Sequence, residues 1–127
     1  MIYTLTLNPA LDYFLSFEQF AEGELNTPKA SYKLAGGKGI NISKVLKNFS
    51  TNSIALGFIG GFTGEFIKNS LASDRIEENF ITINEDTRIN LKINNNGLET
   101  EVAGKSPTIP LEKVRSEERR VGKECRL

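Results

Sequence analysis

This sequence lacks histidine and tryptophan, and it has almost no cysteine. None of the 127 residues is a histidine or a tryptophan, and Cys125 is the single cysteine. One cysteine cannot form an intrachain disulfide, and without histidine neither the usual zinc spacings nor a Ser-His or Cys-His catalytic pair is available. An enzyme made of these residues must therefore work through carboxylates or through a bound phosphate.

Long apolar runs and an excess of one charge are missing as well. No apolar run approaches the ~20 residues that a membrane span needs, and the first residues do not have the basic start of a signal peptide. The 16 basic and 16 acidic side chains cancel, so neither a nucleic acid nor a membrane is favoured as partner. We therefore expect one cytoplasmic globular unit whose partners are small molecules.

The C-terminal stretch differs in character from the rest of the chain. Residues 115–125 have neither helical apolar spacing nor strand alternation, and they resemble the translation of a sequencing-adaptor read. We therefore expect residues 115–127 to be a non-native tail and residues 1–114 to be native sequence. A natural charged tail is the alternative.

Strand and helix patterns alternate along residues 1–83. Residues 3–7 alternate apolar and polar side chains until Asn8-Pro9, where proline cannot continue a ladder. An amphipathic helix is predicted over residues 40–49, with apolar Ile42, Val45, Leu46 and Phe49 at helical spacing. Strands are predicted at 53–59 and 80–83, with a helix capped by Thr63 between them. This order predicts an α/β fold with a mainly parallel sheet flanked by helices.

Two segments indicate antiparallel hairpins instead. Alternating apolar residues on either side of Asn96-Gly97 give the strongest short-range hairpin signal. Residues 11–17 and 31–34 are also rich in strand-forming residues, and a polar stretch separates them. We expect these segments to form a second, smaller sheet beside the main one.

A glycine-rich run provides the strongest functional signal. Gly36-Gly37-Lys38-Gly39 immediately precedes a predicted helix, whose N-terminal N–H groups and dipole can receive an electron-rich ligand. The run matches neither the P-loop nor the dinucleotide fingerprint. A tight structural turn is the alternative interpretation.

Asp12 follows the first predicted strand. This position would put its carboxylate at the carboxyl edge of the sheet, where open α/β folds bind ligands. Taken alone, it could equally be a turn residue or a helix cap. Together with the glycine run, it indicates a ligand site.

Four motifs in this order and spacing resemble the PfkB, or ribokinase-like, sugar kinases. They are Thr-Leu-Asn-Pro-Ala-Leu-Asp (6–12), Gly-Gly-Lys-Gly-Ile-Asn (36–41), Gly-Phe-Ile-Gly-Gly (57–61) and Thr-Arg-Ile-Asn (87–90). The resemblance extends from residue 1 to about residue 112, and the Arg-Ile-Asn-Leu-Lys segment (88–92) is most similar to the branch containing 1-phosphofructokinases and tagatose-6-phosphate kinases.

The resemblance implies a ribokinase-like fold and a kinase activity. The main sheet would carry a small β-sheet lid, made from about residues 11–34 and 88–103, which in this family often also clasps a second copy into a homodimer. The implied reaction transfers a phosphoryl group from ATP, with Mg²⁺, to fructose 1-phosphate, giving fructose 1,6-bisphosphate. A tagatose-6-phosphate kinase is the alternative in the same class, and a non-catalytic sugar-binding module is the alternative in another class.

Site residues follow from the resemblance by position. Asp12 and Asn41 would bind sugar hydroxyls, Gly36 and Gly37 would give close backbone contact, Lys38 would add positive potential near the transferred group, and Arg88 would anchor the sugar's existing phosphate. The alternatives are a solvated surface lysine for Lys38 and a solvated strand arginine for Arg88.

The catalytic base expected from the family is missing from this sequence. In the family it is an aspartate in a Gly-Ala-Gly-Asp segment, and no such segment occurs here. Most of the ATP and Mg²⁺ site would belong to the same missing part. We therefore assign no catalytic residue and no metal ligand, and we expect the 127-residue polypeptide to be an inactive N-terminal fragment.

Overall fold

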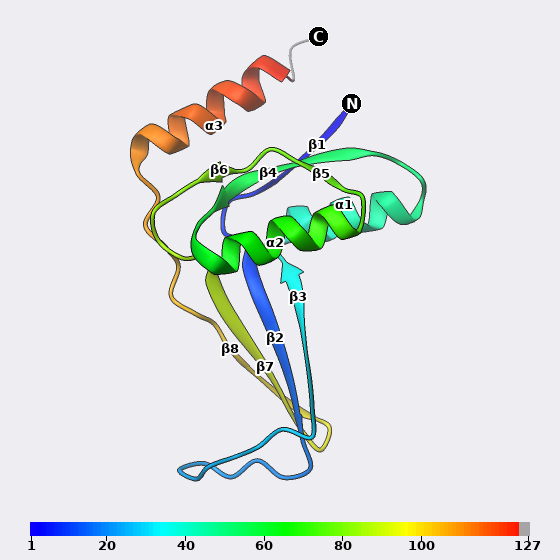
Figure 1. Ribbon diagram of the computed structural model, residues 1–127, viewed down its shortest axis with the longest axis vertical. Helices are drawn as coiled ribbons and strands as arrows, with labels where there is room; N and C mark the ends of the chain where they lie inside the picture. The colour runs from blue at the N-terminus through cyan, green and yellow to red at the C-terminus, as the bar shows by residue number, and fades with distance from the viewer. Residues whose placement is uncertain (125–127) are drawn as a thin grey trace.

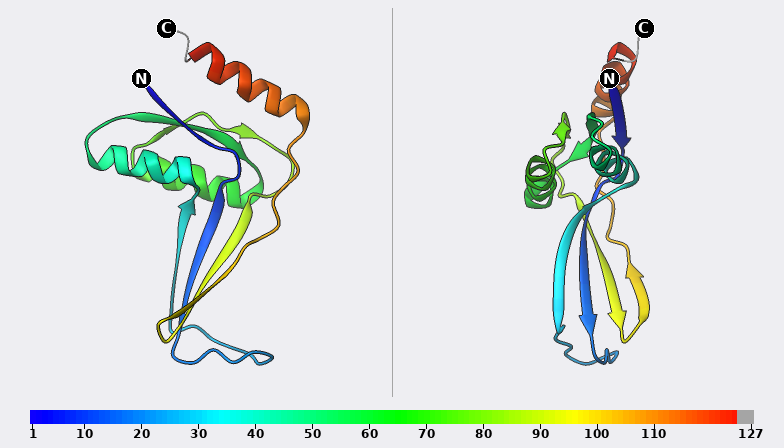
Figure 2. Two further views of the ribbon diagram at one scale, coloured as in Figure 1. Left: turned by 180° about the vertical axis from the view of Figure 1, so that it is seen from behind. Right: turned by 90° about the vertical axis from the view of Figure 1, so that its right-hand side faces the viewer.

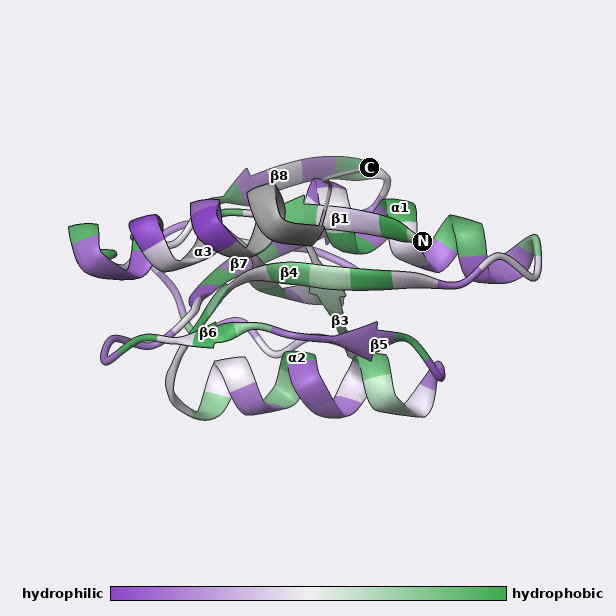
Figure 3. Ribbon diagram, turned by 90° about the horizontal axis from the view of Figure 1, so that it is seen from above, coloured by the Kyte–Doolittle hydropathy of each residue, from purple (hydrophilic) through white to green (hydrophobic). Residues whose placement is uncertain are grey.

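The computed structural model describes residues 1–124, which form two sheets with helices around one of them (Figure 1). The main sheet contains β1 (Ile2–Thr6), β4 (Ser53–Ile59), β5 (Glu77–Glu78) and β6 (Ile81–Thr82). β4 lies at its centre and pairs in parallel with each of the other three strands (Figure 3). The α/β class with a mainly parallel sheet is confirmed.

α1 (Lys38–Asn48) packs against β1 through small and polar residues. Its buried residues are Gly39, Ile40 and Ser43, and the Ser43 hydroxyl lies 2.6 Å from the hydroxyl of Thr4 on β1. The apolar stripe of an amphipathic helix usually faces the core. Here most of that stripe points outward, since Val45 is 53% exposed and Phe49 is 77% exposed. The helix is confirmed, but its inward face is the one that fits closely against the threonines of β1.

α2 (Gly61–Ser73) supplies much of the apolar core on the same side of the main sheet. Its Ile67 and Leu71 are fully buried and belong to one cluster with Ile40 and Ile59. The expected cap is wrong, because Gly60 is the N-cap and no side chain caps the helix. Thr63 lies within the first turn, and its hydroxyl instead donates a hydrogen bond to the carbonyl of Thr87 at 2.7 Å.

The second sheet extends away from the main one as a four-stranded blade, which we call the lid sheet (Figures 1 and 2). Its strands are β3 (Ala30–Gly36), β2 (Ala10–Phe17), β7 (Arg88–Asn95) and β8 (Leu98–Val102), in that spatial order. β2–β3 and β7–β8 are antiparallel hairpins, and Asn96 and Gly97 both have positive φ in the second turn. Both expected hairpins are therefore present.

The two hairpins join through a parallel pair that the sequence pattern did not indicate. β2 lies beside β7 in the same direction, with Asp12 opposite Asn90 and Ala10 opposite Arg88. This pairing brings residues nearly eighty positions apart onto neighbouring strands, and it makes the lid one sheet.

A third helix, α3 (Leu111–Glu124), runs through most of the stretch in which no regular pattern was found. Glutamate, arginine and lysine are good helix formers even without apolar spacing. Val114 of this helix packs with Ile109 against Phe58, Ile81 and Ile83, on the side of the main sheet opposite α1 and α2. The non-native origin of residues 115–127 stays a prediction, and Cys125 lies outside the described residues.

No helix in residues 1–124 is long and apolar enough to cross a membrane.

We predict that the 127-residue polypeptide aggregates when purified alone. Within the described residues β1 pairs only with β4, so its outer edge is open. Leu7 just beyond that strand is 56% exposed, and Val45 on α1 is 53% exposed. An open edge beside exposed apolar side chains promotes association between chains. Size-exclusion chromatography with light scattering should show oligomers of broad size distribution.

Charged substitutions provide the control for this prediction. Leu7→Lys combined with Val45→Lys should increase the monomer fraction. Leu25→Lys should leave it unchanged, because Leu25 is isolated in the loop between β2 and β3, where it is already 97% exposed. A sharp monomer peak for the unsubstituted polypeptide would contradict the prediction.

Candidate functional site

The candidate site is an open groove where the end of β1, the start of α1 and the start of β7 meet. It has a volume of about 480 Å³. Its lining residues are Leu5, Thr6, Leu7, Asn8, Gly37, Lys38, Gly39, Asn41 and Arg88. Four of the six predicted site residues, Gly37, Lys38, Asn41 and Arg88, therefore line one groove.

The glycine run lets α1 begin directly against the end of β1. Gly37 is the N-cap and has φ of 133°, a conformation that side chains disfavour. A Cβ at Gly37 would collide with the Thr6 methyl group, and a Cβ at Gly39 would lie 2.7 Å from the Leu5 carbonyl oxygen. Both glycines are thus required by close packing, and this packing places the first turn of α1 at the groove.

Thr6 closes this junction with a hydrogen bond. Its side-chain oxygen accepts from the Ile40 backbone N–H at 3.0 Å. The first turn of a helix has N–H groups without intrahelical acceptors, and such groups favour anionic ligands. Thr6 takes one of these donors and holds the helix start beside Lys38.

Arg88 is the first residue of β7, and its guanidinium is held at the groove with one donor unsatisfied. Nη2 donates to the Asn8 carbonyl oxygen at 3.2 Å, whereas the buried Nε has no hydrogen-bond partner among the described residues. Arg88 is half-buried, so it is not the fully solvated strand arginine of the alternative interpretation. A buried N–H without an acceptor is unfavourable, and an anion in the groove could satisfy it.

The start of α2 fixes the backbone position from which Arg88 extends. The neighbouring Thr87 is 2% exposed. Its hydroxyl accepts from the Gly60 N–H at 3.0 Å, and its own N–H donates to the Gly60 carbonyl at 2.9 Å. With the Thr63 bond described above, these contacts fasten the base of β7 to the main sheet.

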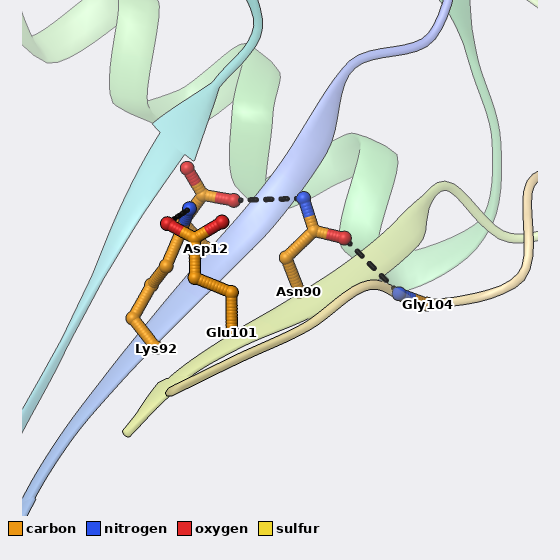
Figure 4. Close-up of polar contacts among 5 residues, drawn as sticks. All are labelled: Asp12, Asn90, Lys92, Glu101 and Gly104. Atoms are coloured by element: carbon orange, nitrogen blue, oxygen red, sulfur yellow. Dashed lines mark hydrogen bonds and ion pairs between the residues drawn. The ribbon is translucent and has the colours of Figure 1, made fainter. Parts of the chain in front are cut away.

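Asp12 lies with Gly36 on the lid sheet and does not line the groove, so its expected position at the carboxyl edge of the main sheet is wrong. Asp12 lines a separate cavity of about 270 Å³ on the lid. Its carboxylate lies against Gly36, and a Cβ at Gly36 would collide with Asp12 Oδ2. Asp12 Oδ1 accepts a hydrogen bond from Asn90 Nδ2 at 3.2 Å (Figure 4). The predicted residues thus form two neighbouring groups that meet at Gly36 and Gly37.

An ion pair lies farther along the same face of the lid. Lys92 Nζ is 2.7 Å from Glu101 Oε1, which joins β7 to β8 (Figure 4). This hydrogen bond raises the pKa of Lys92 above its ordinary value, although the site is exposed. Lys92 donates its hydrogen bond to Glu101. The hydrogen bond to Asp12 comes from the neutral amide of Asn90.

Two asparagines at the site were missed by the sequence analysis. Asn8 orients Arg88 through its carbonyl, and its Nδ2 donates to the Ser106 hydroxyl at 2.7 Å. Asn90 contacts Asp12. Strand alternation places residues 88 and 90 on one face of β7, so the pattern could have indicated Asn90 once β7 was known to lie beside β2.

Comparison with known proteins gives a consistent result. Residues 5–109 match the model of the pfkB family carbohydrate kinases. The chain is 53% identical to a 1-phosphofructokinase from Borreliella burgdorferi over 109 residues, 86% of this chain and 36% of that protein. It is 41% identical to a tagatose-6-phosphate kinase from Staphylococcus epidermidis over 111 residues, 87% of this chain and 36% of that protein. It therefore spans about a third of these curated relatives.

Solved structures agree in fold. Phosphofructokinase-2 from Escherichia coli, determined in complex with substrates and products, superposes with a TM-score of 0.90 at 26% identity. The match covers 96% of this chain and 40% of that one. The two-sheet arrangement described above is therefore shared with a structurally characterised kinase.

We predict that Gly36→Ala destabilises the protein by displacing Asp12. The test uses a chimera in which residues 1–109 replace the matching segment of the Borreliella burgdorferi protein. Overpacking of a well-packed site costs about 1–3 kcal/mol, and denaturant unfolding should show a loss of this size.

A double-substitution cycle identifies the cause of that loss. If the new methyl group collides with the Asp12 carboxylate, Gly36→Ala should cost much less in an Asp12→Ala background. An equal cost in both backgrounds would mean that the methyl group disturbs something other than Asp12.

Proposed function

Because this chain belongs to the pfkB family of carbohydrate kinases, we propose that it forms the acceptor-sugar side of a kinase that phosphorylates fructose 1-phosphate. The product would be fructose 1,6-bisphosphate, and ATP would be the phosphoryl donor. The observation that carries the proposal is the groove in which Arg88, with its unsatisfied buried Nε, lies with Lys38 and the start of α1. Two cations and a helix N-terminus at one groove favour an anionic ligand.

In this proposal each groove residue has a separate task. Arg88 binds the phosphate that the sugar already carries, because a planar guanidinium can make two parallel charge-assisted bonds to phosphate oxygens. Lys38 adds positive potential near the transferred group. Asn41 offers both a donor and an acceptor to a sugar hydroxyl. Gly36 and Gly37 allow the sugar to approach the backbone.

Asp12 would bind the sugar from the lid. A carboxylate accepts hydrogen bonds from hydroxyl groups, and Asp12 Oδ2 is directed toward Gly36, next to the groove. The substrate would then lie between the lid and the helix start, in contact with both groups of residues. Holding the reacting hydroxyl in place is a large part of the catalysis of phosphoryl transfer.

We assign no residue to the donor side of the reaction among those that the structure describes. Among the side chains that the structure describes, no group of three or more His, Cys, Asp or Glu comes together in a way that could hold a metal ion. We therefore derive no step through Mg²⁺ or through ATP from these residues. ATP and Mg²⁺ stay proposals based on the family.

Two other functions remain as alternatives to the proposal. A tagatose-6-phosphate kinase would use the same site chemistry, and the relative at 41% identity supports it; the 53% relative favours fructose 1-phosphate. A non-catalytic sugar-binding module is supported by the missing Gly-Ala-Gly-Asp segment. Genomic DNA beyond codon 114 separates the classes, since an open frame encoding that segment supports the kinase and a native stop codon supports the module.

We also propose that the protein is cytoplasmic. In its full-length form we propose that it forms a homodimer through the lid. The face of the lid opposite Asp12 is apolar and partly uncovered. Leu98 is 69% exposed and Val102 is 46% exposed on this face. A second lid could cover them, because exposed apolar patches commonly mark interfaces.

We predict that the 127-residue polypeptide does not phosphorylate fructose 1-phosphate, whereas the chimera does. The polypeptide has no Gly-Ala-Gly-Asp segment, which would carry the expected base, and the chimera regains it. A coupled assay of ADP release with fructose 1-phosphate, and with tagatose 6-phosphate in parallel, measures both activities. Turnover by the polypeptide alone, or an inactive folded chimera, would contradict the proposal.

We predict that Arg88→Ala in the chimera lowers kcat/KM for fructose 1-phosphate by roughly 10- to 100-fold. A hydrogen bond to a charged group contributes about 1.5–3 kcal/mol, which corresponds to this range. The KM for ATP should change little. Arg88→Lys keeps the charge but loses the planar fork, so it should recover only part of the loss.

Unphosphorylated fructose is the control for the Arg88 substitutions. Whatever weak activity the chimera shows toward it should be nearly unaffected, since fructose has no phosphate for Arg88 to bind. An equal loss for both sugars would mean that Arg88 supports the fold and not the phosphate.

A further inference from the structure

Asn90 connects three separate segments of the chain near the base of the lid (Figure 4). It lies on β7, half-buried, directly opposite Asp12 on β2. Its Nδ2 donates to Asp12 Oδ1 at 3.2 Å, and its Oδ1 accepts from the Gly104 backbone N–H at 3.1 Å. The Asn90 side chain therefore contacts Asp12, which is proposed to bind the sugar, and also the segment that follows β8.

These two contacts determine the orientation of the Asn90 amide. The Gly104 N–H can only donate, so it requires the amide oxygen, and a carboxylate can only accept, so it requires the amide nitrogen. Both requirements select the same rotation of the amide about its last bond. The Gly104 contact thus directs the Asn90 donor toward Asp12.

Gly104 can make this contact because it has no side chain. A Cβ there would collide with the Ile89 carbonyl oxygen. The segment after β8 consequently lies tightly on the backbone of β7, where its N–H reaches Asn90. The support for the amide therefore comes from backbone, which cannot rotate away as a side chain could.

Asn90 forms a hydrogen bond with only one of the two carboxylate oxygens of Asp12. Its nitrogen bonds Oδ1, and Oδ2 is the oxygen nearest to Gly36. Asn90 itself is not among the residues that line the groove or the lid cavity. An effect on the sugar would therefore pass through the Asp12 carboxylate.

We propose that Asn90 is a positioning residue that orients the Asp12 carboxylate for the acceptor sugar. It holds Oδ1 and so presents Oδ2 to a sugar hydroxyl beside Gly36. The inference rests on the proposed function, because it assigns Asp12 a sugar as its ligand. Asn90 is needed for sugar affinity, and it is not a catalytic residue.

Asn90→Asp in the chimera is the most informative substitution. The new carboxylate has nearly the same shape and still accepts from Gly104, but it loses the donor and places a second negative charge against Asp12. A positioning role predicts about a 10-fold or greater increase in KM for fructose 1-phosphate, since a hydrogen bond to a charged group is lost. The KM for ATP should stay within about twofold.

Asn95→Asp is the matched control. Asn95 lies on the same strand but on the opposite face, and its Oδ1 also accepts from a backbone N–H, that of Phe20 at 3.1 Å. The substitution makes the same chemical change and adds the same charge to β7, away from Asp12. Its KM for fructose 1-phosphate should equal that of the parent chimera.

A double-substitution cycle tests whether Asn90 acts through Asp12. In an Asp12→Ala background, Asn90→Asp should produce little further increase in KM, because the carboxylate to be oriented is gone. Denaturant unfolding of every variant shows whether a change in KM merely follows a loss of fold. An unchanged KM for folded Asn90→Asp, or equal effects in both backgrounds, would overturn the inference.

The outcome for Arg88 keeps this test separate from the proposed function. If Arg88→Ala behaves as predicted and Asn90→Asp leaves KM unchanged, only the role of Asn90 is wrong. A folded chimera without activity toward fructose 1-phosphate would overturn both.

Discussion

The close contact between the end of β1 and the start of α1 is the constraint on which the candidate site depends. Thr6 occupies the space that side chains at Gly37 and Gly39 would need, and its hydroxyl oxygen accepts from the N–H of Ile40. This contact sets where α1 begins, and thereby where Lys38 and Asn41 meet the groove. A larger residue at either glycine would push the helix away from the strand and open the site.

The lid contributes a second constraint, which is the parallel pairing of β2 with β7. The pairing sets Ala10 beside Arg88 and Asp12 beside Asn90. The base of β7 is in turn tied to the start of α2 through the buried Thr87. A lid attached in this way can present Arg88, which is proposed to bind the phosphate, and Asp12, which is proposed to bind a hydroxyl group. The two residues extend from neighbouring strands, so the sheet sets the spacing between them.

The sequence pattern predicted the strands and the turn correctly, but it did not predict which face of α1 is buried. Alternating apolar residues located the main strands, and the Asn96-Gly97 dipeptide located the β7–β8 turn, because both signals are local. The apolar stripe of α1 was misleading about its inward face. The buried face of α1 is instead the one with the small residues Gly39 and Ser43, because these can pack closely against Thr4 and Thr6 of β1. No pattern within a helix contains that information.

The sequence by itself determined the α/β class, the two hairpins and the glycine-rich helix start, because these depend on residue type and on local spacing, which the chain carries without folding. Asp12 was indicated by its place beside the glycine run, whereas Asn41 and Arg88 became candidate ligands only through the resemblance to the PfkB family. Only the tertiary structure decided that Asn90 contacts Asp12, that Arg88 has a buried Nε without a partner, and that residues 111–124 form a helix packed through Val114. The first two depend on pairing between distant strands and on burial. The packing of the helix depends on which sheet face it meets, and all three are set by the whole fold at once.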